Sequence, residues 1–171
     1  MNTRLKKANK IAIIALAIII AITVPVYLYM RQNSGTEGSI QIKGAVGNTV
    51  SFTYSELQAF PPFTVQVTLV SSSHSADNGD FSYTGVQLKT LLEQAQVSAN
   101  ASSVYIQAAD GYGATISMED AQNEKTILAY QKDGEALTPL SSGGEGPVRL
   151  IMGADQYAQR WIRGVSVIEV S

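Results

Sequence analysis

The 171-residue chain contains no cysteine and only one histidine. Without cysteine the chain can form no disulfide and can offer no thiolate to a metal ion. A single histidine does not supply the paired ligands that most zinc sites use. The glycine-rich run Gly143 to Gly146 has no P-loop lysine, and no Gly-x-Ser-x-Gly segment is present. These absences exclude the common zinc, P-loop and α/β-hydrolase types of site.

The first 30 residues have the pattern of a membrane anchor. Residues 1–10 form a basic segment without acidic residues, and residues 11–30 contain no charged side chain. A run of 20 such residues is long enough to cross a hydrocarbon layer of about 30 Å, and basic residues before it favour a cytoplasmic N-terminus. A cleaved signal peptide is the alternative, but its apolar core is usually shorter. We therefore predict an uncleaved transmembrane signal anchor that places the C-terminal domain outside the cytoplasm, as a single-pass protein of the cell membrane.

The part of the chain beyond this segment is acidic. Four of the 12 basic residues and none of the 14 acidic residues lie in residues 1–30, which leaves 8 basic against 14 acidic residues, or a net charge of about −6. An acidic domain is unsuited to nucleic acid, whose phosphates need a basic face. Residues 31–37 are a short polar linker, and residues 38–171 are long enough for one domain with its own core.

The stretch from Thr64 to Gln96 predicts a strand, a loop and a helix. Residues 64–70 alternate between apolar and polar side chains, as a half-buried strand does, and residues 71–80 are turn formers and small polar residues. Thr84 and Gln87 have the spacing of a capping box, and Leu88, Leu91, Leu92 and Ala95 recur at helical spacing.

Short strands and short helices alternate irregularly in the rest of the domain. The predicted strands are residues 39–43, 49–53, 104–109, 113–116, 126–130, 135–137, 148–152 and 164–170. Two further short helices are predicted over residues 55–60 and 118–123, the second with Ser117 as its N-cap. Asp133-Gly134 is a strong hairpin signal. No regular βαβ rhythm appears, so the predicted class is α+β with a mixed, largely antiparallel sheet.

Several segments, in order and at similar spacing, resemble the molybdopterin-binding domain of the sulfite oxidase family. They are YTGVQLKTLLEQAQV from Tyr83, DGYGATISMEDA from Asp110, TILAYQKDGEALTP from Thr126, GPVRLIM from Gly146 and RWIRGVSVIEV from Arg160. The resemblance covers nearly all of the chain after residue 37. It implies that family's fold and names molybdopterin as the cofactor that the fold would hold.

The resemblance also assigns candidate cofactor-binding residues. The family's metal-ligating cysteine corresponds to Ser71. A serine hydroxyl is a poor anion at neutral pH, so we expect Ser71 to be a loop or strand-end residue and not a metal ligand. His74 lies in the same loop, where it could contact a ligand. Arg160 matches a basic residue associated with the pterin phosphate, and an arginine can hold phosphate bidentately. The next residue, Trp161, is expected to be a core anchor.

Three functions are compatible with these features. The first, which we favour, is a non-catalytic domain of the sulfite oxidase fold that has lost the molybdenum ligand and binds a small anionic ligand or a protein. The second is a molybdopterin-dependent oxidoreductase that uses a ligand other than thiolate. The third is an accessory subunit of a membrane redox complex. The missing cysteine favours a protein that is not an enzyme and carries no metal.

Overall fold

The computed structural model describes residues 19, 20, 22–24, 38–70 and 78–171. The chain divides into two compact units, Met1–Asn33 and Ser34–Ser171. In the first unit the described residues are helical, and the Thr23 hydroxyl donates to the Ile19 carbonyl at 2.8 Å. Among the described residues, no helix has both the length and the apolar character that crossing a membrane requires. The anchor predicted for residues 11–30 falls mainly outside the described part and remains a prediction.

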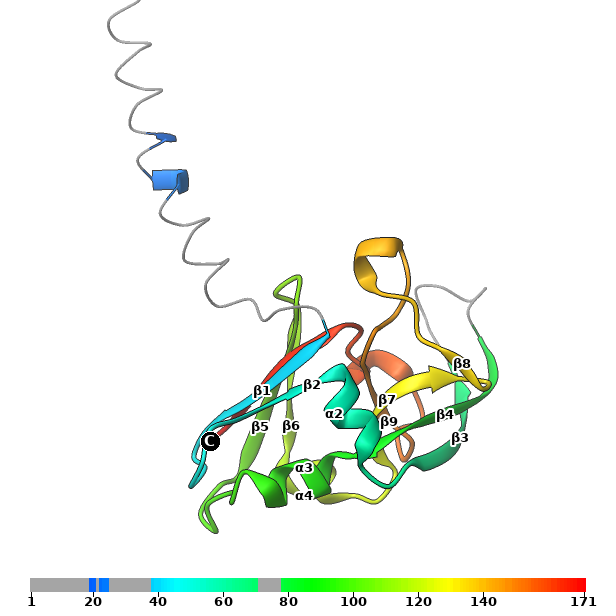
Figure 1. Ribbon diagram of the computed structural model, residues 1–171, viewed down its shortest axis with the longest axis horizontal. Helices are drawn as coiled ribbons and strands as arrows, with labels where there is room; N and C mark the ends of the chain where they lie inside the picture. Colours follow the sequence, from blue (N-terminus) through cyan, green and yellow to red (C-terminus); the bar gives the residue numbers. More distant parts are fainter. Residues whose placement is uncertain (1–18, 21, 25–37, 71–77) are drawn as a thin grey trace, which may run out of the picture. The chain divides into compact units, whose positions relative to one another are not determined.

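The second unit contains two five-stranded sheets, which lie side by side in the view of Figure 1. The first has the strand order β2-β1-β10-β5-β6, with bounds β1 Ser39–Gly44, β2 Val50–Thr53, β5 Ser103–Ala108, β6 Gly113–Ser117 and β10 Val165–Val170. The second has the order β3-β4-β7-β8, with β9 also paired to β7; its bounds are β3 Phe63–Leu69, β4 Gly79–Gln87, β7 Thr126–Lys132, β8 Glu135–Ala136 and β9 Arg149–Met152. The observed class is therefore α+β, as predicted.

Among the described strands, every pair is antiparallel except β1 and β10, which run parallel. Gln41 lies opposite Val167 in this pair, and Gly44 lies opposite Val170. The first and last strands of the domain are thus neighbours in the centre of one sheet. The sequence predicted the mixed character but not the division into two sheets.

Short helices join and cover the sheets. The α-helices are α2 Tyr54–Ala59, α3 Leu88–Gln94 and α4 Met118–Gln122, and the 3₁₀ helices are η2 Leu140–Ser142 and η3 Ala158–Arg160. Helix α2 contacts both β2 and β4, and α3 and α4 contact each other. In Figure 1, α3 and α4 lie at one end of the domain, whereas η2 lies at the opposite end.

Two local signals of the sequence are confirmed. The Ser117 hydroxyl accepts a hydrogen bond from the Asp120 backbone N–H at 3.0 Å and caps α4. Asp133 and Gly134 have φ angles of +52° and +85°, and they join β7 to β8. Both positive φ angles belong to the tight turn that an Asp-Gly pair favours between antiparallel strands.

The prediction for residues 79–87 was wrong. The sequence predicted a loop to Asp80 and a helix N-terminus at Thr84, but β4 runs from Gly79 to Gln87 and pairs with β3 and β7. The Thr84 hydroxyl lies 2.8 Å from the Thr64 hydroxyl across the sheet, and α3 begins only after Gln87, without a side-chain cap. Pairing on both sides of β4 outweighs a local capping pattern that is worth about 1 kcal/mol.

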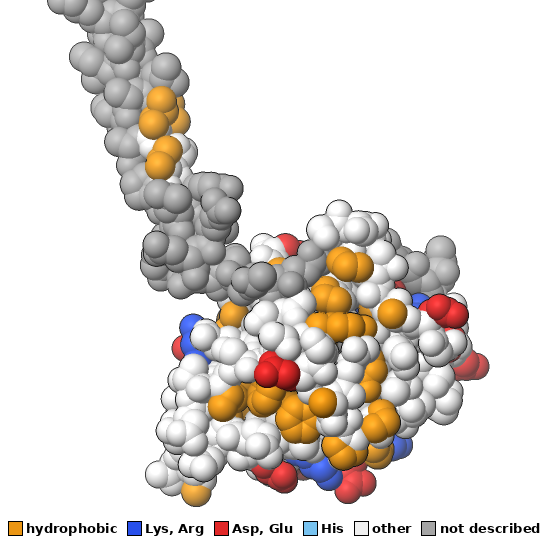
Figure 2. Space-filling view, viewed as in Figure 1, with side chains coloured by type: hydrophobic (Ala, Val, Ile, Leu, Met, Phe, Trp, Pro, Cys, Tyr) orange, Lys and Arg blue, Asp and Glu red, His pale blue; other side chains and the backbone are white. Residues whose placement is uncertain are grey.

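One hydrophobic core joins the two sheets and the three α-helices. Its buried members include Ile40 and Ile42 from β1, Leu128 from β7 and Ile168 from β10. On the outside, hydrophobic side chains gather around α2 (Figure 2), where Phe52, Ala59 and Phe60 help to line a shallow groove of about 400 Å³. The core is large enough to hold the domain together without disulfides, as the sequence indicated.

Candidate functional site

Ser71 and His74, two of the three predicted site residues, lie outside the described residues. The structure does describe the residue before them: the Val70 carbonyl accepts a hydrogen bond from the Ala158 backbone N–H at 3.2 Å. Ala158 begins η3, which ends at Arg160. The end of β3 therefore lies beside η3, so the segment that carries Arg160 adjoins the residue that precedes Ser71.

Arg160 is held by two carboxylates of the same chain. Its Nε and Nη2 donate to Asp155 at 3.0 and 2.6 Å, and its Nη1 donates to Asp120 at 2.6 Å. Bonds to Asp155, and then to Asp120, raise the pKa of the Arg160 guanidinium above its ordinary value. The three side chains together carry a net charge of −1. This arrangement is unfavourable for a phosphate, because Arg160 is already neutralised.

The hydrogen bond from Arg160 lowers the pKa of Asp120 below its ordinary value of 3.8, and a bond from Ser117 contributes further. A carboxylate whose pKa is lower in the folded state stabilises the fold above its unfolded pKa, and that stabilisation is lost as the pH falls through the folded pKa. Both partners are partly exposed, so the contribution is expected to be below about 1 kcal/mol.

We expect Asp120→Asn to flatten the acid side of the stability profile. The urea midpoint of the wild type should fall more steeply than that of the variant between about pH 4 and the folded pKa, because only the wild type takes up a proton at this position on unfolding. Glu119→Gln, which changes an exposed carboxylate on the same helix, is the control. Parallel profiles for wild type and Asp120→Asn would contradict the assignment.

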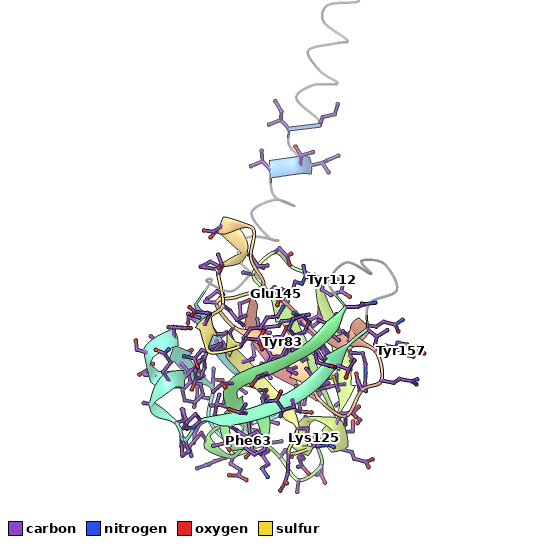
Figure 3. The ribbon with its side chains drawn as sticks, turned by 90° about the vertical axis from the view of Figure 1, so that its right-hand side faces the viewer. Phe63, Tyr83, Tyr112, Lys125, Glu145 and Tyr157 are labelled. Carbon is purple, nitrogen blue, oxygen red and sulfur yellow. The ribbon has the colours of Figure 1, made fainter. Side chains whose placement is uncertain are left out.

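A second ionic group, which is partly buried, lies next to the aromatic side chains of the domain. Arg149, in β9, is 3% exposed and forms a hydrogen-bonded ion pair with Glu145. Its Nη1 also donates to the Tyr83 hydroxyl at 3.0 Å, and that hydroxyl donates to Glu145 at 3.3 Å. The Nζ of Lys132 lies 3.7 Å from the other Glu145 oxygen. Figure 3 shows Tyr83 and Glu145 close together.

Aromatic rings enclose these charges. The guanidinium of Arg149 lies 5.6 Å from the Tyr83 ring centre and 5.5 Å from that of Trp161, and the Lys132 ammonium lies 3.8 Å from the ring of Phe81. Burial, and to a lesser extent the Glu145 carboxylate, raises the pKa of Tyr83 well above its ordinary value, although Arg149 acts in the opposite direction. Tyr83 therefore stays neutral and can donate a hydrogen bond at any physiological pH.

Trp161 connects this buried group to Arg160. It is 5% exposed, its indole N–H donates to the Met152 carbonyl at 3.2 Å, and its ring meets that of Tyr83 edge to face at 6.1 Å. The expectation that Trp161 is a core anchor is confirmed. We call Tyr83, Lys132, Glu145 and Arg149 the buried ionic cluster.

The sequence alone does not identify the buried ionic cluster as a site. One signal was available: Arg149 is a charged residue inside the apolar strand VRLIM, and such a residue needs a buried partner. The partner, Glu145, lies in a segment that reads as a simple glycine-rich loop. Tyr83 and Lys132 come from two other strands, so no sequence pattern links them to Arg149.

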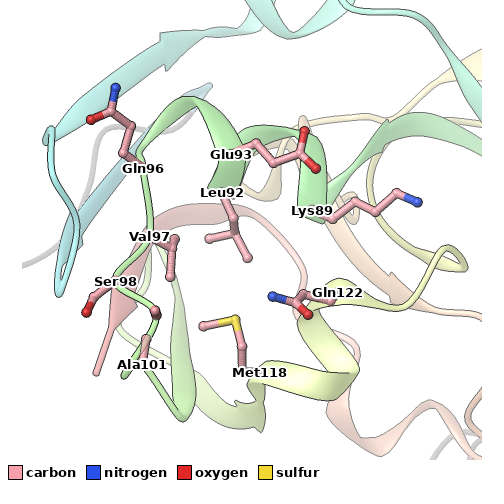
Figure 4. Close-up of a pocket in the computed structure, with 10 residues that line it drawn as sticks. Lys89, Leu92, Glu93, Gln96, Val97, Ser98, Ala101, Met118 and Gln122 are labelled. Atoms are coloured by element: carbon pink, nitrogen blue, oxygen red, sulfur yellow. The ribbon is translucent and has the colours of Figure 1, made fainter.

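A larger hollow lies between α3, residues 95–101 and α4, at the end of the domain opposite η2 in Figure 1. It has a volume of about 620 Å³ (Figure 4), and Leu92, Val97 and Met118 line it with apolar groups. Lys89, at its rim, is paired with Glu124 at 3.3 Å. Because the one cation of its lining, Lys89, is already paired, this hollow is a poor candidate for the cofactor site.

The donor set does not fit a thiolate-held molybdenum centre. A soft thiolate is the ligand that the resemblance implies, and the chain has no cysteine. Within the described ranges, no three histidine, cysteine, aspartate or glutamate side chains gather in a way that could hold a metal ion. The cation expected to bind the pterin phosphate, Arg160, is neutralised by Asp155 and Asp120.

Comparison with known proteins nevertheless shows a clear relationship. Residues 30–171 match the family model described as the oxidoreductase molybdopterin binding domain. The "Uncharacterized oxidoreductase YuiH" of Bacillus subtilis (strain 168) is 25% identical over 134 residues, which are 76% of this chain and 65% of that protein. The sulfane dehydrogenase SoxCD of Paracoccus pantotrophus has a similar structure, with a TM-score of 0.66 and 22% identity over 79% of this chain and 39% of that one.

These matches extend over most of this chain but only over part of each relative. The structural match supports the fold alone, a sulfite oxidase-like arrangement of mixed sheets. The family match covers both sheets and the buried ionic cluster. The chain belongs to the oxidoreductase molybdopterin binding domain family.

Proposed function

We propose that this chain is a membrane-anchored, extracytoplasmic member of the family that binds a small anionic ligand or a protein and does not catalyse a molybdenum-dependent reaction. The observation that supports this proposal best is the state of Arg160. In a domain that holds a pterin phosphate, the basic residue at this position would face the phosphate. Here it donates to Asp155 and Asp120, which leaves a net negative group of side chains.

The missing cysteine supports the same proposal. Ser71, at the position that the resemblance assigns to the metal ligand, cannot supply a soft anionic donor at neutral pH. The membrane anchor rests on the 20 uncharged residues 11–30 and on the basic residues before them. A single anchor and a linker of seven residues, 31–37, would keep the domain close to the membrane surface.

A molybdopterin-dependent oxidoreductase is the second candidate, either acting alone or as a subunit of a membrane redox complex. Family membership favours it, and the names of both relatives describe oxidoreductases. It would require a molybdenum ligand other than thiolate and a rearrangement of the ion pairs around Arg160. A non-catalytic binding domain requires neither of these changes.

Elemental analysis and pterin extraction distinguish the two candidates. The full chain is produced in a host that makes molybdopterin, and membranes and cytosol are separated before extraction with detergent. We expect the chain in the membrane fraction with fewer than about 0.1 molybdenum atoms and pterins per chain. Near-stoichiometric molybdenum and pterin would overturn the non-catalytic proposal, and a chain that stays in the cytosol would overturn the anchor.

A matched variant separates the two obstacles to a molybdenum centre. Ser71→Cys supplies a thiol at the family position but leaves Arg160 paired with Asp155 and Asp120. We expect this variant to remain free of molybdenum and pterin, like the wild type, when a molybdenum enzyme from the same host is fully loaded. Stoichiometric loading of Ser71→Cys would show that the carboxylates around Arg160 do not prevent cofactor binding.

A further inference from the structure

The Glu145 carboxylate is the anion that the other side chains of the buried ionic cluster bind. It lies between Gly144 and Gly146, and its side chain is 22% exposed. One carboxylate oxygen accepts hydrogen bonds from Arg149 and Tyr83, and the other faces the Lys132 ammonium. Three donors, each on a different strand, therefore surround one carboxylate. The residue that carries this carboxylate belongs to none of the three strands.

The donors exceed what Glu145 can neutralise. Lys132 and Arg149 carry two positive charges against one, so these four side chains have a net charge of +1, although the nearby Asp133 carboxylate also acts on Tyr83. Among the described residues, the Nε of Arg149 is a buried nitrogen with no hydrogen-bond partner. A buried unpaired donor on a charged group is costly, so a polar partner at this position would be stabilising.

Open space reaches the same carboxylate from the surface. A hollow of about 230 Å³ lies between the β7–β8 hairpin and residues 137–145, and Lys132, Leu137, Gly144 and Glu145 line it. A molecule in this hollow would lie against Lys132 and Glu145. The backbone of Gly143, at φ +79°, gives the segment before Glu145 a conformation that other residues rarely adopt.

We propose that Tyr83, Lys132 and Arg149 form a carboxylate-binding site that Glu145 fills from within the chain. The ligand is a small molecule, or the end of a larger one, that bears a carboxylate and enters through the 230 Å³ hollow by displacing Glu145. In the wild type such a ligand competes with the Glu145 carboxylate, whose effective concentration we take as about 1 M, above that of a flexible linker because hydrogen bonds hold it in place. This inference rests on the proposed function, because it names the ligand class of a binding domain.

Chemical rescue of Glu145→Ala tests the site. The substitution removes a CH₂–COO⁻ group, which acetate replaces almost atom for atom. The chain has one tryptophan, Trp161, 5.5 Å from the Arg149 guanidinium, so its fluorescence reports unfolding and binding near the cluster. The full chain in detergent is heated in 100 mM sodium acetate and in sodium chloride of equal ionic strength.

We expect acetate, relative to chloride, to raise the thermal midpoint of Glu145→Ala by about 3–5 °C, as binding with a dissociation constant of about 10 mM would. Wild type, Glu145→Gln and Glu135→Ala should shift by less than about 1 °C. In the wild type and Glu145→Gln a side chain still fills the site, whereas Glu135 lines the hollow without forming part of the cluster. If Glu145→Ala does not fold in chloride, its refolding yield in acetate becomes the readout.

An equal response of Glu145→Ala to acetate and chloride would overturn the proposal, and so would the same acetate effect in Glu135→Ala. Neither result bears on molybdenum or pterin content, which is measured separately. Failure of this inference is therefore distinguishable from failure of the proposed function.

Discussion

Arg149→Met is expected to lower the free energy of unfolding by about 3–5 kcal/mol, the usual effect of removing one partner from a buried ion pair. Arg149 is 3% exposed, and its loss leaves Glu145 with only the more distant Lys132 as a cationic partner. The substitution also removes the hydrogen bond to Tyr83 and the contacts of the guanidinium with the Tyr83 and Trp161 rings. Urea unfolding of residues 34–171 measures the change.

The double variant Arg149→Met/Glu145→Gln separates the cost of an unpaired charge from the loss of packing. It should recover about half of the stability lost by Arg149→Met, because no partly buried carboxylate is left without its arginine. Lys43→Met breaks the exposed pair with Glu169 and should cost less than about 1 kcal/mol. A loss of similar size in Lys43→Met and Arg149→Met would show that burial of the pair does not matter.

Gly85→Ala is expected to cost about 3 kcal/mol, at the upper end of the range for overpacking a core. A Cβ atom at Gly85 would overlap the Leu128 carbonyl oxygen and lie 2.5 Å from the Ala129 Cα. Both are main-chain atoms of β7, opposite the register shift between Thr84 and Gly85. They can yield only if the two strands move apart, and this would disturb the cluster residues on either side. Thermal and urea unfolding check the effect.

Gly134→Ala is the control for conformational strain without a clash. Gly134 has a φ of +85°, but no atom lies within 4 Å of the position of an added Cβ. Its substitution should cost about 1–2 kcal/mol, the usual penalty for an L-residue in the left-handed region. If Gly85→Ala and Gly134→Ala cost the same, the contact with β7 is not the reason for glycine at position 85.

Local patterns predicted those parts of the fold that local interactions determine. Ser117 caps α4 and Asp133-Gly134 makes the hairpin, and both were evident from a few neighbouring residues. In the strand at residues 63–69, apolar and polar side chains alternate, and buried and exposed positions alternate in the same way. The segment at Thr84 was misread, because its capping pattern is local but the pairing of β4 is with strands far away in the chain.

The candidate site was predicted only in part. The family resemblance assigned Arg160 to the pterin phosphate, a role that stays a prediction, but it did not reveal the two carboxylates that pair with Arg160. Asp120 lies 40 residues before Arg160, so the ion pair exists only because α4 and η3 meet in the folded domain. The same holds for Tyr83 and Arg149, which are 66 residues apart.

The sequence by itself determined that no thiolate can hold a metal in this chain, that the domain is acidic, and that its elements are short strands and helices of the α+β class. Composition and local periodicity are sufficient for these conclusions, because they depend on residue types and on neighbours. Only the tertiary structure decided which cations are already neutralised, because the charge at a site depends on partners from distant strands. For this reason the buried ionic cluster, and the role of Glu145 within it, became evident only in the folded domain.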